Sequence, residues 1–113
     1  MKKASLVNKR AAVRKGRRLT LRPSNARARQ DLGGGFLREV FGPFTIPANG
    51  FLTITFRAGT GRVVINAGWT ISGLAAAWPT DSFPSSDTTW ILILQNPTNA
   101  ARTVRAFLIS KTR

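Results

Sequence analysis

Residues 89–95 read TWILILQ, and this stretch decides how the chain folds. Trp90 to Leu94 are five consecutive apolar side chains, so both faces of an extended strand would be hydrophobic. A short apolar run between turn signals is typical of a strand that is covered on each side. We therefore place this strand centrally in a β-sheet and expect other strands to pair with it.

The segments around this strand also have strand patterns. Residues 51–57 (FLTITFR) alternate between apolar and polar side chains, which predicts a half-buried antiparallel strand. The remaining predicted strands are residues 36–46, broken near Gly42-Pro43, residues 62–71, residues 74–78 and residues 102–109. In residues 62–71, one face carries Val63, Ile65, Ala67 and Trp69. In residues 102–109, the inward side chains are Val104, Ala106 and Leu108, and the outward ones include Phe107 and Ile109.

Turn chemistry separates these strands. Residues 47–50 (PANG) contain Asn49-Gly50, the strongest short hairpin signal, while residues 58–61 (AGTG) and 96–100 (NPTNA) predict two further turns. Residues 79–88 contain two prolines among Ser and Asp and predict a long loop. About six strands and no helical periodicity predict an all-β fold, a small antiparallel β-sandwich or barrel.

A strongly basic segment precedes the strands. Residues 1–30 hold eleven of the 18 Lys and Arg residues and no acidic one, whereas the other 83 residues hold seven basic and four acidic residues. Such a charge block does not form its own core. We expect residues 1–32 to be an extended basic N-terminal arm ordered by a partner, although Leu19-Thr20-Leu21 could add as a strand to a neighbour. Residues 33–35 (GGG) are the predicted hinge, and residues 36–113 the β-sandwich domain.

The composition argues against catalysis. The chain has no His, Cys or Tyr, and three of its four acids lie in predicted linker or loop segments. We expect Glu39 to form a surface ion pair with its neighbour Arg38. The glycine clusters lack the strand and helix context of a phosphate-binding loop. We therefore predict no enzyme, no cofactor and no metal site, and we expect oligomerisation or docking to supplement a small core without disulfides.

The predicted contact residues are the basic side chains of the arm and one tryptophan. Trp69 and Trp90 fit core positions, whereas Trp78 lies in the irregular part, where it is a candidate contact for another protein. The full set is Lys2, Lys3, Lys9, Arg10, Arg14, Lys15, Arg17, Arg18, Arg22, Arg27, Arg29 and Trp78.

A basic arm, a glycine-rich hinge and a cysteine-free β-domain together resemble small viral and bacteriophage virion proteins. Residues 42–56 (GPFTIPANGFLTITF) and 88–110 (TTWILILQNPTNAARTVRAFLIS) look like their strand–turn–strand units, and the second also resembles repeats of secreted bacterial β-sandwich proteins. A jelly-roll shell subunit needs eight strands and a longer body. The resemblance therefore implies a cement, decoration or minor capsid protein.

Two functions follow as expectations. The first is a virion structural protein, made in the host cytoplasm, whose arm anchors it to an acidic capsid lattice or to other copies of itself as a homo-oligomer. The second is a sequence-independent nucleic-acid-binding packaging protein, of nucleocapsid or ribosome-associated type, whose arm binds phosphates. No apolar run reaches 18 residues, so we expect no membrane partner.

Overall fold

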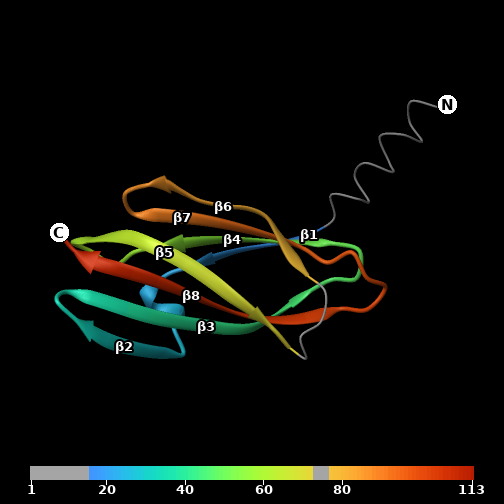
Figure 1. Ribbon diagram of the computed structural model, residues 1–113, viewed down its shortest axis with the longest axis horizontal. Coiled ribbons are helices and arrows are strands. Elements are labelled where there is room, and N and C mark those ends of the chain that lie inside the picture. Colours follow the sequence, from blue (N-terminus) through green and yellow to red (C-terminus); the bar gives the residue numbers. More distant parts are fainter. Residues whose placement is uncertain (1–15, 73–76) are drawn as a thin grey trace.

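The computed structural model describes residues 16–72 and 77–113. Within them the chain forms eight strands and the short 3₁₀ helix η1 (Figure 1). In chain order the elements are β1 (Gly16–Leu21), η1 (Pro23–Asn25), β2 (Ala28–Gly33), β3 (Phe36–Ile46), β4 (Phe51–Arg57), β5 (Arg62–Ile71), β6 (Trp78–Ser86), β7 (Thr89–Gln95) and β8 (Arg102–Thr112).

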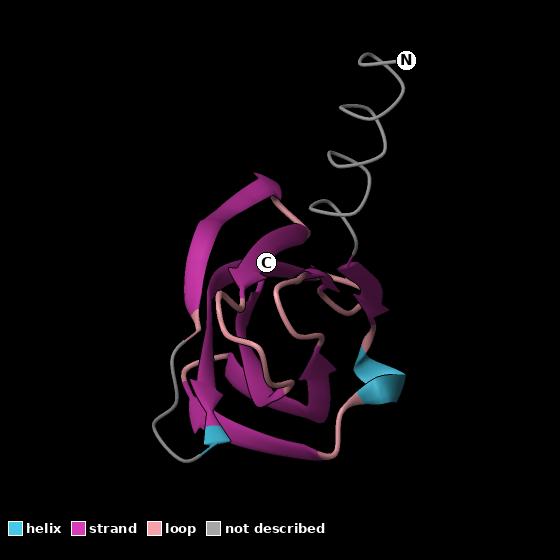
Figure 2. Ribbon diagram, turned by 90° about the vertical axis from the view of Figure 1, so that its right-hand side faces the viewer, coloured by secondary structure: helices cyan, strands magenta, loops and turns pink. Residues whose placement is uncertain are grey.

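The strands form two four-stranded sheets that face each other, and Figures 1 and 2 show the two layers from two sides. The strand order is β1-β4-β7-β6 in the first, called sheet A here, and β2-β3-β8-β5 in the second, called sheet B. All pairings are antiparallel except that of β1 with β4, which is parallel. The predicted all-β sandwich is confirmed, with eight strands in place of about six.

The core lies between the sheets and consists of alternate side chains of each strand. The most buried apolar residues are Leu21, Phe41, Ile46, Leu52, Ile54, Phe56, Ala67, Leu92, Leu94, Val104, Ala106 and Leu108. The rings of Phe41 and Phe56 meet across the sandwich with 5.7 Å between centroids. Because burying one large apolar side chain contributes about 1.5–3 kcal/mol, this two-layer contact holds the sheets together.

Residues 16–33 belong to the sandwich, which corrects the predicted boundaries of arm and hinge. β1 adds to β4, with Leu19 and Leu21 facing the core, and β2 pairs with β3. The expectation that residues 19–21 could add as a strand is confirmed within the chain itself. Residues 33–35 are a tight β2–β3 turn in which all three glycines have positive φ (85°, 63° and 86°), a conformation that glycine adopts without strain. The basic segment folds here because backbone pairing and two leucines outweigh the repulsion of its charges.

The segment predicted as a loop, residues 79–88, is also a correction, because most of it forms the edge strand β6. The strand pairs with β7 through two irregularities, between Pro79 and Asp81 and between Pro84 and Ser86. Proline lacks the N–H that a central strand needs, so it is tolerated at a sheet edge and at bulges. All residues of β6 except Phe83 are exposed, which suits its mostly polar side chains.

A bulge changes the predicted face of β5. The register with β8 shifts between Val64 and Asn66, which leaves Ile65 as an extra residue with 44% of its surface exposed. After the bulge, Ala67 and Trp69 face the core as predicted, but Ile65 does not share their face.

β7 lies at the centre of sheet A, as predicted, but its outer face is not covered. Leu92 and Leu94 are fully buried, whereas Ile91 and Ile93 on the opposite face are half-buried. The turn at residues 47–50 is present, with Gly50 N–H donating to Pro47 O at 3.1 Å, yet it joins β3 of sheet B to β4 of sheet A and is no hairpin. In residues 16–72 and 77–113 no helix is long and apolar enough to cross a membrane.

Candidate polyanion-binding surface

The predicted contact residues divide into two groups. Lys2, Lys3, Lys9, Arg10, Arg14 and Lys15 lie outside the described residues. The others lie on the strands of the sandwich or next to them, so their backbone positions are fixed relative to both sheets.

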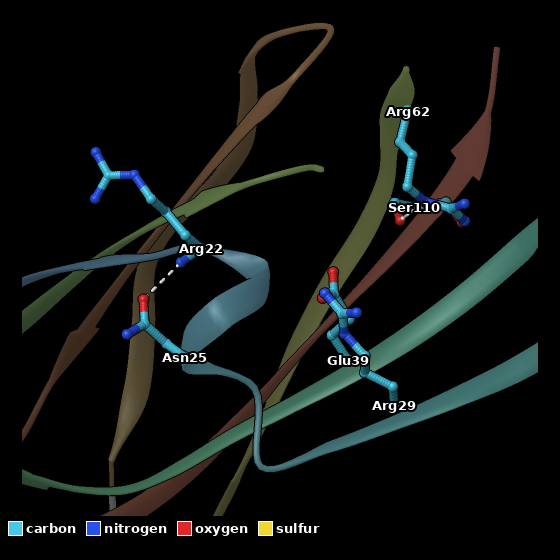
Figure 3. Close-up of polar contacts among 6 residues, drawn as sticks. All are labelled: Arg22, Asn25, Arg29, Glu39, Arg62 and Ser110. Carbon is cyan, nitrogen blue, oxygen red and sulfur yellow. Dashed lines mark hydrogen bonds and ion pairs between the residues drawn. The ribbon is translucent and has the colours of Figure 1, made fainter. Parts of the chain in front are cut away.

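Arg17, Arg18 and Arg22 are exposed at the edge of sheet A that β1 forms. The guanidinium of Arg17 donates to the carbonyl oxygen of Thr45 at 3.3 Å, which bridges β1 to β3 of the other sheet. Arg18 points outward from sheet A, because its partner Thr53 lies on the outer face of β4. The backbone N–H of Arg22 donates to Asn25 Oδ1 at 2.9 Å, as Figure 3 shows, and its side chain is exposed.

Arg29 serves the fold rather than an open site. It lies directly opposite Glu39 in the β2–β3 pair, and its guanidinium approaches a carboxylate oxygen at 3.3 Å (Figure 3). Glu39 is fully buried, so the predicted surface ion pair with Arg38 is wrong; Arg38 instead donates to Gln30. The contact satisfies the ion-pair distance without hydrogen-bond geometry. Its energy is therefore mainly Coulombic, and its effect is to hold β2 against β3.

A second polar cluster closes the end of sheet B. The guanidinium of Arg62 donates to Ser110 Oγ at 2.8 Å, which ties β5 to β8 (Figure 3). It also donates to Gly35 O at 2.8 Å, which ties β5 to the glycine turn. Ser110 is fully buried, so this arginine satisfies a polar group that would otherwise lack a partner.

The outer face of sheet B carries a surface that was not predicted from the sequence. Three hollows of about 200, 300 and 290 Å³ adjoin one another there, and Arg105 lines all three. Arg38 and Phe107 line the second hollow, and Arg27 lines the third. Val40 of β3 lines both of these hollows. We call the surface formed by Arg27, Arg38, Val40, Arg105 and Phe107 the arginine groove.

The bulge in β3 positions Arg105 and Arg27. The β3–β8 register is interrupted between Phe41 and Phe44, opposite Arg105, and the chain turns there at Gly42 with a φ of 104°. A Cβ atom at Gly42 would lie 3.0 Å from the carbonyl oxygen of Val104 and 3.4 Å from Cα of Arg105, so the close approach favours glycine. The guanidinium of Arg27 donates to Gly42 O at 3.3 Å and is held beside the same bulge.

Phe107 forms the floor of the arginine groove. It is paired with Gly68 of β5, and a Cβ atom on that glycine would lie 2.3 Å from Phe107 Cζ. The ring therefore lies across the glycine and fills the space of its missing side chain. The glycine thus holds the ring in place as an apolar part of the groove.

The charge of the arginine groove is uncompensated. None of the four acidic residues lines any of the three hollows. Glu39 is buried and lies 3.3 Å from Arg29, and Asp87 lies 3.8 Å from Arg113. Guanidinium groups present several N–H donors in a plane and suit phosphate or carboxylate oxygens. The described residues contain no group of His, Cys, Asp and Glu that could hold a metal ion.

The sequence carried part of the signal for this surface. Alternation in β8 places Arg105 and Phe107 on the outer face, as predicted for Phe107. What brings Arg38 beside them is the β3–β8 pairing, which places Arg38 opposite Ile109, 71 positions later in the chain, while Arg27 lies just before β2, the next strand of the same sheet. Trp78, by contrast, was correctly expected at the surface and is 50% exposed at the start of β6.

The family model described as YjdH matches residues 17–110, a span that reaches from β1 into β8. No curated protein and no solved structure matches the chain.

Proposed function

The chain belongs to the YjdH family, and we propose that it is a non-catalytic protein that binds nucleic acid through the phosphate backbone. The observation that carries this proposal is the arginine groove, in which three guanidinium groups surround adjoining hollows that no acidic side chain lines. The basic residues between 2 and 15 add six charges to the same chain.

The dimensions of the groove suit a chain of phosphates. Arg38 pairs with Ile109 of β8, so Arg105 lies four residues further along the sheet. At about 3.3 Å per strand residue this separation is about 13 Å, and a nucleic-acid strand places several phosphates over such a span. In residues 16–72 and 77–113 no helix is long enough to enter a major groove. Binding is therefore expected to be independent of base sequence.

A salt titration tests the proposal. Binding of a fluorescent 20-base-pair duplex is measured by anisotropy at salt concentrations from about 50 to about 400 mM KCl, because the release of counterions from the phosphates makes affinity fall over this range. Replacing Arg105 with Gln should weaken binding and reduce the log–log salt slope by about 0.9, and the combined Gln variant of Arg27, Arg38 and Arg105 should reduce it by roughly two to three. Arg57→Gln, an exposed arginine at the end of β4 on the other sheet, is the matched control and should keep most of the slope.

Two outcomes would contradict this proposal. A flat plot for the wild-type chain excludes phosphate binding altogether. The second outcome combines two results: the triple variant keeps the wild-type slope, and a full-length chain whose six basic residues between 2 and 15 are Gln gives a flat plot. Binding then belongs to those six residues and not to the groove.

A second candidate function is the virion structural protein expected from the sequence, anchored by its basic side chains to an acidic capsid lattice. The observation that favours a protein partner is the half-exposed indole of Trp78 on a different sheet from the groove. Competition distinguishes the two functions. Polyglutamate should displace the duplex poorly if the groove is built for phosphate, and as well as unlabelled duplex at equal charge if it is built for carboxylates.

A further inference from the structure

The outer face of sheet A is a half-exposed apolar surface. Its central strands β4 and β7 present Phe51, Ile91 and Ile93 outward, and the edge strand β6 adds Phe83 and Trp78. Trp78 is 50% exposed. Scattered apolar residues need no explanation, but five on one face form a contiguous patch, which marks an interaction surface. We call this surface the apolar face.

The sheet pairings arrange the apolar face in rows that cross all four strands. The first row is Gly16, Phe51, Gln95 and Trp78. The second row is Arg18, Thr53, Ile93 and Asp81, and the third is Thr20, Thr55, Ile91 and Phe83. Each row therefore begins on β1 with a small or basic residue and ends on β6 with an aromatic or acidic one.

This arrangement is complementary to itself. A two-fold axis that runs parallel to the strands between two facing copies places β1 of one copy over β6 of the other, at the same height along the strands. Arg18 then faces Asp81 of the second copy, and the pair occurs twice. Neither residue pairs with an opposite charge within the described part of its own chain.

The first row is complementary in shape. A hollow of about 200 Å³ lies at the β1 end of the apolar face, lined by Gly16, Arg17, Arg18, Phe51, Thr53 and Ile93. Under the same two-fold axis this hollow faces Trp78, the most exposed aromatic side chain of the described residues. The other in-plane axis, perpendicular to the strands, would place Arg18 against Arg18 and is disfavoured by repulsion.

We propose that the apolar face binds a second copy of this chain, as a two-fold symmetric dimer in which Arg18 pairs with Asp81 and Trp78 enters the hollow beside Gly16. Four strands at about 4.8 Å and six residues at about 3.3 Å give a face of roughly 400 Å², or about 800 Å² for both copies, before side-chain relief is counted. Interfaces of this size are weak, so the dimer should form at micromolar concentration. The proposal does not rest on nucleic-acid binding.

Charge exchange tests the pairing. Sedimentation velocity is run on the full chain over a concentration series near 0.1 M salt, without nucleic acid. Arg18→Asp and Asp81→Arg should each weaken dimerisation by at least about tenfold, because each creates two like-charge contacts. The double variant R18D/D81R restores opposite charges and should recover the wild-type dissociation constant to within about threefold.

Trp78→Ala should also weaken dimerisation by about tenfold or more, because a buried aromatic anchor is lost. Arg105→Asp is the matched control, since it makes the same charge change on the outer face of the other sheet, and it should leave the dimer unchanged. A wild-type chain that stays monomeric over the series, a double variant as weak as the single ones, or an equal effect of Arg105→Asp would each overturn the proposal. Circular dichroism of every variant confirms that the β-sandwich is retained.

Discussion

Asn96 is the side chain whose removal tests how this sandwich is closed without a disulfide. It is fully buried at the end of β7, where the chain leaves sheet A for β8 of sheet B. Its Nδ2 donates to Ala100 O at 2.8 Å and to Pro47 O at 3.2 Å, and its Oδ1 accepts from the N–H and the hydroxyl of Thr98 at 3.0 and 2.7 Å. One side chain thus joins two connections that cross between the sheets.

We predict that Asn96→Ala lowers the free energy of unfolding by about 3 kcal/mol. The four shorter of its five hydrogen bonds, at a net value of about 1 kcal/mol each, set an upper limit of about 4 kcal/mol; the fifth, from Nδ2 to Ile46 O, is 3.4 Å long. The loss is smaller than the sum because two carbonyls have another donor: Pro47 O still accepts from Gly50 N–H, and Ala100 O, 3.0 Å from the Thr98 hydroxyl, can accept from it once Asn96 Oδ1 is gone. At about 4–8 °C per kcal/mol for a domain near this size, the melting temperature should fall by roughly 12–24 °C.

Urea unfolding followed by tryptophan fluorescence and thermal unfolding followed by far-ultraviolet circular dichroism measure the change. The matched control is Asn99→Ala in the same connection, where the side chain is exposed and its amide oxygen accepts one long contact, 3.4 Å, from Asn49. The control should change stability by less than about 0.5 kcal/mol. A loss below about 1 kcal/mol for Asn96→Ala, or equal losses for the two variants, would refute the reasoning.

Two further predictions concern sheet B. Arg29→Ala should lower the free energy of unfolding by about 1–3 kcal/mol, because it leaves the buried Glu39 carboxylate without its counter-charge. Glu39→Gln should stay within about 1 kcal/mol of wild type. Chemical unfolding measures both variants, and equal losses would show that the charge of the pair does not determine its effect on stability. Gly68→Ala should cost about 1–3 kcal/mol, because the new Cβ occupies the position of the Phe107 ring. Adding Phe107→Ala should then make Gly68→Ala nearly neutral in a double-mutant cycle, and an additive result would contradict the contact.

Much of the fold could be predicted from hydrophobic pattern alone. The alternation of residues 51–57 and 102–109 fixes which side chains face the core, since side chains in a strand alternate with a period of two. The apolar run at residues 90–94 indicated a central strand, and β7 is central in sheet A. The two sides of β7 are apolar for different reasons, however. One side packs in the core between the sheets, and the other is part of the apolar face of sheet A.

Features that depend on a partner strand could not be predicted. The bulge at Ile65 exists because β5 must stay in register with β8, and periodicity within β5 does not reveal it. β6 was mistaken for a loop because its composition is polar and contains proline, which an edge strand tolerates since half of its backbone groups face no neighbour. Asn49-Gly50 predicted a turn correctly, but the residues of a turn do not determine whether the next strand joins the same sheet.

The position of the charges is where the structure changes the interpretation most. Five of the arginines assigned to an arm, between positions 17 and 29, lie in β1, η1 and β2 or next to them, on a framework that also carries Arg38 and Arg105. Backbone positions that are already fixed on a sheet lose little conformational freedom when a ligand binds. The arginine groove should therefore bind a polyanion with a small backbone entropy cost per contact. The salt titration tests the arginine groove and the six basic residues between 2 and 15 separately, since equal numbers of charges at the two places need not contribute equally to affinity.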